Sequence, residues 1–405
     1  MPLLSYPGSY AVGTVPIETA PATPHSHGVL ASIFYPTDAD ARQPQSTWLL
    51  GPRKFYSTGF GDYVNLSRWI SAGPMAWLLD SFRMPARAGA ALLQVKMDEE
   101  NGDARRYPVA VFCHGLAGNQ TTYSTFCGTL ASRGFVVVSI GHRDGSGSVA
   151  ARNNYKERIP CKLNGLYCRC ANRLRMVTLL ADKRQPSDQD EYTFRNDQLM
   201  QRAREVEEAM QLLRDLDRGT VITNLLSNNL PDFKRRLDLQ SAVIMGHSFG
   251  GVTALYALQL PGTPFIAGVI LDPWMMALPT YSAITVPILS IQSEVFHWPA
   301  NVQQMQKLFN QPSANILNQF SVVKGTKHQD ISDVPSLVFG ILKLVRQQGA
   351  VAPKVVHSTY DSLVTGFLQK VYKGRYANYL QDTVVANVDT SVAVHGPAAY
   401  GLLPK

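Results

Sequence analysis

The stretch Ala242-Val-Ile-Met-Gly246-His-Ser248-Phe-Gly250-Gly decides the fold. Its four leading apolar residues are typical of a buried strand, and the largely apolar residues 252–258 are typical of a helix. Between them lies a G-x-S-x-G motif in the strand–turn–helix context that a nucleophile elbow requires. Gly246 and Gly250 lack the Cβ atoms that would clash where strand and helix cross closely. The stretch therefore predicts a strained Ser248 at a helix N-terminus, where N–H groups stabilise developing negative charge. The alternative is an ordinary glycine-rich turn.

Apolar runs on both sides of this stretch predict the remaining elements. Strands are expected at 29–36, 107–113, 135–140, 267–271, 286–291 and 320–323. Helices are expected at about 122–132, 199–219, 335–347 and 359–373. This alternation predicts an α/β fold with a mostly parallel central sheet flanked by helices on both faces, and the nucleophile elbow makes it an α/β-hydrolase fold. Without repeats or linkers, residues 1–405 are expected to form one domain, with an irregular lead-in at about 1–28 and a C-terminal tail at about 376–405.

The composition limits the class of protein. The 405 residues are 45% hydrophobic, which is enough for a large core. Prolines interrupt the N-terminal residues where a signal peptide needs an apolar run, and no stretch of 18 uncharged apolar residues occurs. We therefore expect a cytoplasmic protein without a transmembrane helix, and Pro2 excludes N-myristoylation. The five cysteines are expected to be reduced; Cys161, Cys168 and Cys170 match no familiar zinc spacing, so no metal site is expected.

The net charge of +8 is concentrated in residues 151–185, which hold nine basic and two acidic residues. The simpler interpretation is a solvated basic loop. The sharper interpretation is a patch attracted to anionic lipid headgroups. The segment has neither a recognisable binding motif nor interleaved aromatic residues, so nucleic acid is not expected as a partner.

A second stretch with two open interpretations is residues 66–82. Large apolar side chains gather there around Gly73-Pro74, namely Trp69, Trp77, Leu78, Leu79 and Phe82. They form either a helical hairpin packed into the core or an interfacial anchor, because Trp and Leu suit the headgroup boundary of a membrane. The residues alone favour the core.

A nucleophilic serine needs a histidine to take its proton and a carboxylate to orient that histidine. In this fold the three follow in the order serine, acid, histidine. His328 comes directly after the last expected strand, in a loop marked by glycine, and is preferred over His297. Asp272 ends the first strand after the elbow and Glu294 ends the second. Strand positions alone do not decide between these two acids.

The loop after strand 107–113 reads His114-Gly115-Leu116-Ala-Gly118. In α/β-hydrolases this loop donates one N–H group to the oxyanion of the reaction intermediate. Gly115 lets the backbone turn so that the Leu116 amide faces the site. His114 is expected to brace the loop rather than to act as a base.

Seven short segments occur in one order along the chain. They are Phe-Cys-His-Gly-Leu (112–116), Gly-His-Arg-Asp (141–144), Arg-Asn-Asp-Gln (195–198), Gly-His-Ser-Phe-Gly-Gly (246–251), Leu-Asp-Pro-Trp-Met (271–275), Ser-Glu-Val-Phe-His-Trp-Pro-Ala-Asn (293–301) and Gly-Thr-Lys-His-Gln (325–329). With them, residues from about 7 to 375 resemble the platelet-activating factor acetylhydrolases of the plasma and intracellular type II group, the group VII phospholipases A2.

The resemblance implies a role for particular residues. The family's acid lies in the Leu-Asp-x-Trp-Met motif, which implies Asp272, with Ser248 and His328 as its partners. The oxyanion amides of the family correspond to Leu116 and Phe249. The family's membrane-contacting helix falls on residues 69–82, which favours the interfacial interpretation of that stretch.

The resemblance also implies the reaction. It is a serine-dependent, calcium-independent hydrolysis of the short or oxidised sn-2 acyl ester of phospholipids, platelet-activating factor among them. No cofactor is implied, and no obligate protein partner is expected. The substrate implies peripheral contact with a membrane or a lipid particle. A general carboxylesterase or lipase on the same fold, and a non-catalytic lipid-binding protein, are the alternatives.

Overall fold

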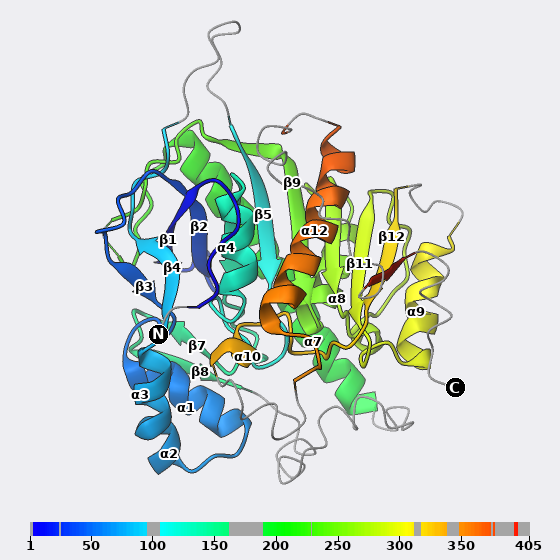
Figure 1. The fold of residues 1–405 in the computed structure, drawn as a ribbon, viewed down its shortest axis with the longest axis horizontal. Coiled ribbons are helices and arrows are strands. Elements are labelled where there is room, and N and C mark those ends of the chain that lie inside the picture. The colour runs from blue at the N-terminus through cyan, green and yellow to red at the C-terminus, as the bar shows by residue number, and fades with distance from the viewer. Residues whose placement is uncertain are drawn as a thin grey trace, which may run out of the picture.

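The computed structural model describes residues 3–23, 26–94, 106–161, 189–227, 229–311, 317–337, 348–373, 376 and 393–395. Its main feature is an eleven-stranded sheet with the strand order β13-β12-β11-β10-β9-β5-β6-β2-β1-β4-β3 (Figure 1). The strands are β1 (Ala11–Glu18), β2 (Leu30–Thr37), β3 (Gln45–Thr47), β4 (Arg83–Ala88), β5 (Tyr107–Cys113), β6 (Val136–Ile140), β9 (Leu237–His247), β10 (Ala267–Leu271), β11 (Ile288–Ser293), β12 (Gln319–Val323) and β13 (Ala393–His395).

The centre of the sheet is parallel and its margins are mixed. Strands β6, β5, β9, β10, β11 and β12 pair in parallel, whereas β2 joins β6 and β13 joins β12 in antiparallel fashion. A separate hairpin consists of β7 (Val149–Arg152) and β8 (Glu157–Pro160). Because the carboxyl ends of parallel strands meet at one edge, the loops after β5, β9, β10 and β12 come together there.

Helices cover both faces of the sheet. Helices α4 (Ser124–Ser132) and α12 (Pro353–Tyr372) contact each other on one face, and α7 (Gln189–Arg218) and α8 (Phe249–Gln259) do so on the other (Figure 1). The remaining helices are α1 (Arg53–Tyr63), α2 (Arg68–Ala72), α3 (Pro74–Asp80), the 3₁₀ helix η1 (Met275–Ala277), α9 (Pro299–Phe309) and α10 (Val334–Leu337). The mostly parallel sheet with helices on both faces is therefore confirmed.

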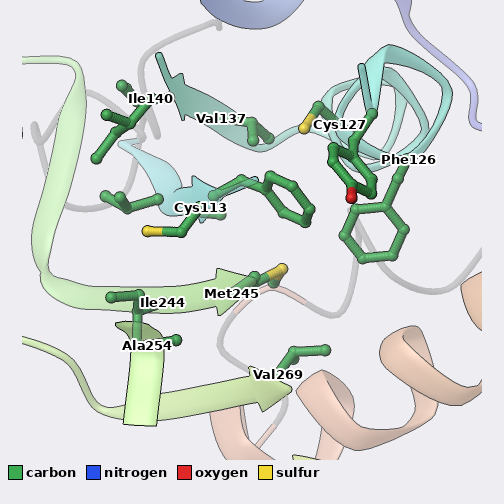
Figure 2. Packing of buried hydrophobic residues seen from close by; sticks show 14 of the residues in the cluster. Cys113, Phe126, Cys127, Val137, Ile140, Ile244, Met245, Ala254 and Val269 are labelled. Carbon is green, nitrogen blue, oxygen red and sulfur yellow. The ribbon is translucent and has the colours of Figure 1, made fainter. Parts of the chain in front are cut away.

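The core lies on both sides of the central strands. Every residue of β5 and β6 is buried, because helices pack on both faces of these strands. Figure 2 shows side chains of α4, β6, β5, β9 and β10 meeting in this cluster, among them Phe126, Val137, Cys113, Met245 and Val269. Each such large apolar side chain contributes roughly 1.5–3 kcal/mol when fully buried. The core is thus a rigid base for the loops at the strand ends.

The irregular lead-in expected at 1–28 is wrong for Ala11–Glu18. Residues Ala11–Glu18 form β1, which pairs antiparallel with β2 and parallel with β4. The pairing with β4 covers only residues 12–14, so Pro16 lies beyond it and its missing N–H breaks no bond to that strand. Strand β13 lies in the C-terminal tail expected at about 376–405.

Three further expectations fall partly outside the described residues. Of the basic segment 151–185, only residues 151–161 are described. Most of them belong to the β7–β8 hairpin and not to an irregular loop. Cys168 and Cys170 lie outside the described residues, so the expectation about zinc is not tested there. The helix expected at 335–347 is described only as Val334–Leu337.

Residues 66–82 contribute the short helices α2 and α3, which pack on α1 and on each other. Figure 1 shows α1–α3 at the end of the molecule toward which β5 points. Within the described part of the chain, no helix is both long and apolar enough to cross a bilayer.

Candidate active site

Ser248 lies in the tight turn between β9 and α8. Its φ of 57° and ψ of −118° place a non-glycine residue in a strained conformation, as the sequence predicted. A Cβ on Gly246 would lie 2.1 Å from the Gly250 oxygen, and one on Gly250 would lie 2.0 Å from the Cys113 oxygen. Both glycines are therefore required by the close crossing of α8 over β9 and β5.

The structure brings Ser248, His328 and Asp272 together from three strand ends. His328 Nε2 is 2.9 Å from Ser248 Oγ, and His328 Nδ1 is 3.1 Å from Asp272 Oδ2. With the ring proton on Nδ1, that nitrogen donates to the carboxylate while Nε2 accepts from the serine hydroxyl. Asp272 follows β10 with a φ of 42°, and His328 lies in the loop after β12. All three residues are buried.

Ser293 orients the carboxylate of Asp272. Its backbone N–H donates to Oδ1 and its hydroxyl donates to Oδ2, each at 2.6 Å. Burial still raises the pKa of Asp272 to about 6, although these hydrogen bonds and the nearby His247 act in the opposite direction. Burial lowers the pKa of His328 to about 3, so its imidazole is neutral at pH 7 and able to accept a proton.

The alternative acid and base lie elsewhere. Glu294 Oε2 accepts a hydrogen bond from the Gly325 amide at 2.6 Å, so this carboxylate fixes the loop that leads to His328. The buried His297 has its ring centroid 5.7 Å from that of Phe320. The hydrogen bonds to Ser248 and to Asp272 are made by His328.

The loop that carries Leu116 packs directly against Ser248. A Cβ on Gly115 would lie 3.0 Å from the Ser248 Cβ. Neither the Leu116 amide nor the Phe249 amide, the first of α8, is a donor among the backbone hydrogen bonds of the described residues. The His114 side chain accepts a hydrogen bond at Nε2 from the His142 amide, 3.1 Å away, which fits the expected bracing role of His114.

Sequence reasoning missed several neighbours of the histidine. The Phe296 ring stacks on His328 with 3.9 Å between centroids and an interplanar angle of 11°. The His247 ring lies 4.4 Å from His328 and has Nδ1 2.7 Å from the Tyr123 hydroxyl. His247 was visible as the residue before the serine in the motif, but nothing in the sequence placed its ring beside His328.

One carboxylate and two imidazoles at this site are also close enough together to be metal ligands. Ligand atoms of His247, Asp272 and His328 lie within 4.8 Å of one another. Both ring nitrogens of His328 are already hydrogen-bonded, and a cation would have to displace Ser248 or Asp272. The geometry fits proton transfer from serine to histidine better than it fits metal ligation.

The stretch 69–82 divides into two groups. Trp69 is 78% exposed, Trp77 70% and Leu78 38%. Leu79 and Phe82, expected in the same lipid-contacting group, are only 4% exposed and belong to the core. Their assignment to lipid contact is therefore wrong, because tertiary packing buries both side chains in the core.

The fold and the arrangement around Ser248 are those of the α/β-hydrolases. A ferulic acid esterase from Streptomyces cinnamoneus has the same fold, with a TM-score of 0.64 at 16% identity over 98% of this chain and 99% of that one. The family platelet-activating factor acetylhydrolase, isoform II, matches residues 2–392. The chain belongs to this family, as the sequence motifs indicated, and is a carboxylic ester hydrolase.

Individual relatives agree with the family match. A platelet-activating factor acetylhydrolase of Bos taurus is 29% identical over 90% of this chain and 76% of its own length. The enzyme of the same name from Canis lupus familiaris is 30% identical over 80% of this chain and 67% of its own length. A protein of Schizosaccharomyces pombe named as a putative phospholipase A2 is 26% identical over 76% of each chain.

Proposed function

We propose that the chain hydrolyses the short or oxidised sn-2 acyl ester of phospholipids, with Ser248 as nucleophile and without calcium. The observation that carries the mechanism is the hydrogen-bonded series Ser248–His328–Asp272 at a strained strand–helix turn. The names of the relatives, platelet-activating factor acetylhydrolase and putative phospholipase A2, support the substrate class.

The reaction proceeds in two halves. Ser248 Oγ attacks the ester carbonyl while His328 Nε2 takes the hydroxyl proton, and Asp272 stabilises the resulting imidazolium. The Leu116 and Phe249 amides donate to the oxyanion of the tetrahedral intermediate. His328 then protonates the leaving lyso-phospholipid, which leaves the acyl group on Ser248. Water, deprotonated by His328, attacks that acyl group, and His328 returns the proton to Ser248 Oγ as the short acid leaves. The serine and the two amides supply the nucleophile and the charge stabilisation that calcium and its bound water supply in other phospholipases A2.

The test is a panel of phosphatidylcholines graded in sn-2 length, with and without chelator, and with a long-chain triglyceride for comparison. We expect fastest hydrolysis of the acetyl ester, no effect of the chelator, and a loss of about 10⁴ or more in Ser248→Ala. Preference for the triglyceride would instead make the chain a general lipase. Fluorophosphonate labelling that persists in Ser248→Ala would reassign the nucleophile. Absence of both turnover and labelling in the wild type would favour a non-catalytic binding protein.

We further propose that the enzyme is cytoplasmic and reaches its substrate by peripheral contact with a lipid surface through Trp69, Trp77 and Leu78. The exposure of these three side chains supports this contact. So does the place of α2 and α3 at the end of the molecule where the strand that precedes the Leu116 loop ends (Figure 1). The Arg53 guanidinium lies 4.2 Å from the Trp77 ring centroid and is ion-paired with Asp80 at 3.2 Å, so it packs on the exposed Trp77 ring without adding an unpaired charge.

A further inference from the structure

Arg202, on α7, is a fully buried cation outside the group that carries the proposed chemistry. Its side chain is 0% exposed. Nη1 donates to the His114 carbonyl at 2.7 Å, Nε donates to Asp144 Oδ2 at 3.0 Å, and Nη2 donates to the Ser146 hydroxyl at 2.6 Å. A buried charge with this number of hydrogen bonds holds its neighbours in one geometry, because breaking any of them leaves a desolvated group unpaired.

Two of these neighbours fix the backbone around Leu116. The amide that is to donate to the oxyanion belongs to the peptide group between Gly115 and Leu116. The preceding peptide group contains the His114 carbonyl, which Arg202 binds directly. The following one contains the Ala117 N–H, which donates to the Ser146 carbonyl at 2.8 Å. Since Arg202 also holds the Ser146 hydroxyl, the Leu116 amide is tethered on both sides, and Ala117 is kept at a φ of 59°.

The residue that carries the second oxyanion amide packs its ring against the same guanidinium. The Arg202 Cζ atom is 4.5 Å from the centroid of the Phe249 ring, a cation–π distance. Phe249 is fully buried and is the first residue of α8, directly after Ser248. The guanidinium therefore holds the loop after β5 through hydrogen bonds and also lies over the ring of Phe249, the residue that follows Ser248.

We propose that Arg202 is a positioning residue for the oxyanion hole, which sets the Leu116 and Phe249 amides relative to each other. It touches neither substrate nor Ser248, and it acts through the His114 carbonyl, Ser146 and the Phe249 ring. The inference rests on the proposed function, since it assumes these two amides as the oxyanion donors. Lysine cannot replace arginine here, because an ammonium group has no planar face and no fork of donors.

The experiment compares Arg202→Lys and the double variant Arg202→Met/Asp144→Asn with the wild type. The double variant removes both charges, so it leaves no unpaired buried carboxylate. The measurements are kcat and KM on p-nitrophenyl acetate and the Ki of a short-chain trifluoromethyl ketone, whose serine adduct places an oxyanion in the hole. Rates are expressed per site titrated to completion with a fluorophosphonate, so loss of folded protein does not imitate loss of catalysis.

In both variants we expect kcat to fall by about 10- to 100-fold, since misplacement by about 1 Å costs this much. KM should stay nearly constant, and the Ki of the ketone should rise by the same factor as kcat falls. Wild-type kcat and Ki in Arg202→Lys would overturn the proposal. So would a fall in kcat with an unchanged Ki, because the defect would then lie outside the oxyanion hole.

A matched control separates positioning from stability. Arg133 forms a buried ion pair with Asp361 between the end of α4 and α12, on the opposite face of the sheet from α7. Arg133→Met should lower Tm but leave kcat and the ketone Ki per titrated site unchanged. Failure of the proposed serine mechanism is recognised separately, because the wild type would then not react with the fluorophosphonate at all, and a different substrate preference is recognised from the lipid panel.

Discussion

At the scale of single residues, the main feature of the site is the buried carboxylate of Asp272, which hydrogen bonds hold in place. Asp272 has Ser293 on both of its oxygens and His328 on one of them. Such a carboxylate orients the imidazole and stabilises the cation that forms during proton transfer. Glu294, one residue after Ser293, instead binds the Gly325 amide and so shapes the loop.

Asp272→Asn should therefore reduce kcat by about 10⁴, as removal of the acid does in other triads. Glu294→Gln is the matched control, because it removes a nearby charge but keeps an oxygen that can accept from Gly325. We expect its kcat to stay within about tenfold of the wild type. Both are measured on a soluble acetyl ester with Tm as a check on folding. The reverse order of effects would reassign the acid to Glu294.

The pH dependence should show one acid limb near pH 6. With a pKa raised to about 6, Asp272 takes up a proton below that pH and no longer orients His328, so activity is present above about pH 6 and lost below it. The lowered pKa of His328 keeps the imidazole neutral through this range. The measurement is kcat/KM between about pH 4.5 and about pH 8.5.

Ser293→Ala tests the origin of that limb. The Ser293 hydroxyl favours the ionised carboxylate, so its removal should raise the pKa of Asp272 and move the limb to higher pH. A limb that does not move, in a variant whose fold is intact by circular dichroism at each pH, would show that another group titrates.

At the scale of elements, the crossing of α8 over β9 and β5 sets the position of Ser248. A side chain on Gly250 would overlap the backbone of Cys113, which cannot move without disturbing β5. The tight turn at Ser248 therefore depends on direct packing of the α8 backbone at Gly250 against the β5 backbone at Cys113.

Gly250→Ala should lower the free energy of unfolding by about 1–3 kcal/mol or more, because the added methyl group has no space. Gly366→Ala is the control: Gly366 lies within α12, and a Cβ there meets nothing within 4 Å. This second change should stabilise the protein by about 0.5–1 kcal/mol, because alanine favours helix over glycine. Denaturant melts of the two variants measure both effects. Equal stability of the two would contradict the close crossing.

At the scale of the whole molecule, a helical hairpin lies at the end toward which β5 points (Figure 1). Trp69 and Trp77 face solvent there, whereas Leu79 on the same hairpin packs into the core. Each exposed side chain that enters a lipid interface contributes on the order of 1–2 kcal/mol, which is enough for reversible peripheral binding when several act together.

Replacing Trp69 and Trp77 by Ser should weaken binding to phosphatidylcholine vesicles by about 30- to 1,000-fold, given that contribution per residue. Activity on a soluble acetyl ester and Tm should hardly change, because both side chains lie outside the core. Leu79→Ala is the contrasting variant and should lower Tm. If the double serine variant instead lowers Tm and soluble-ester activity together, the two tryptophans are structural.

The sequence by itself determined the central part of the fold. The runs 107–113 and 267–271 match β5 and β10 residue for residue, because strands buried on both faces are apolar throughout. It also predicted the conformation of Ser248, because the glycines two residues before and after it leave one way to turn. It placed Asp272 and His328 at strand ends, but only family resemblance chose Asp272 over Glu294.

Only the tertiary structure decided the remaining features, because they depend on contacts between distant residues. The sequence predicted an irregular segment at 1–28, whereas pairing with β2 and β4 forms the strand β1 within it. Leu79 and Trp77 are both large apolar residues in the sequence, and packing alone buries Leu79 and leaves Trp77 exposed. Arg202 has no local signal, since its partners His114 and Asp144 are 88 and 58 residues away in the chain. A charge becomes part of a site only when folding desolvates it beside its partners.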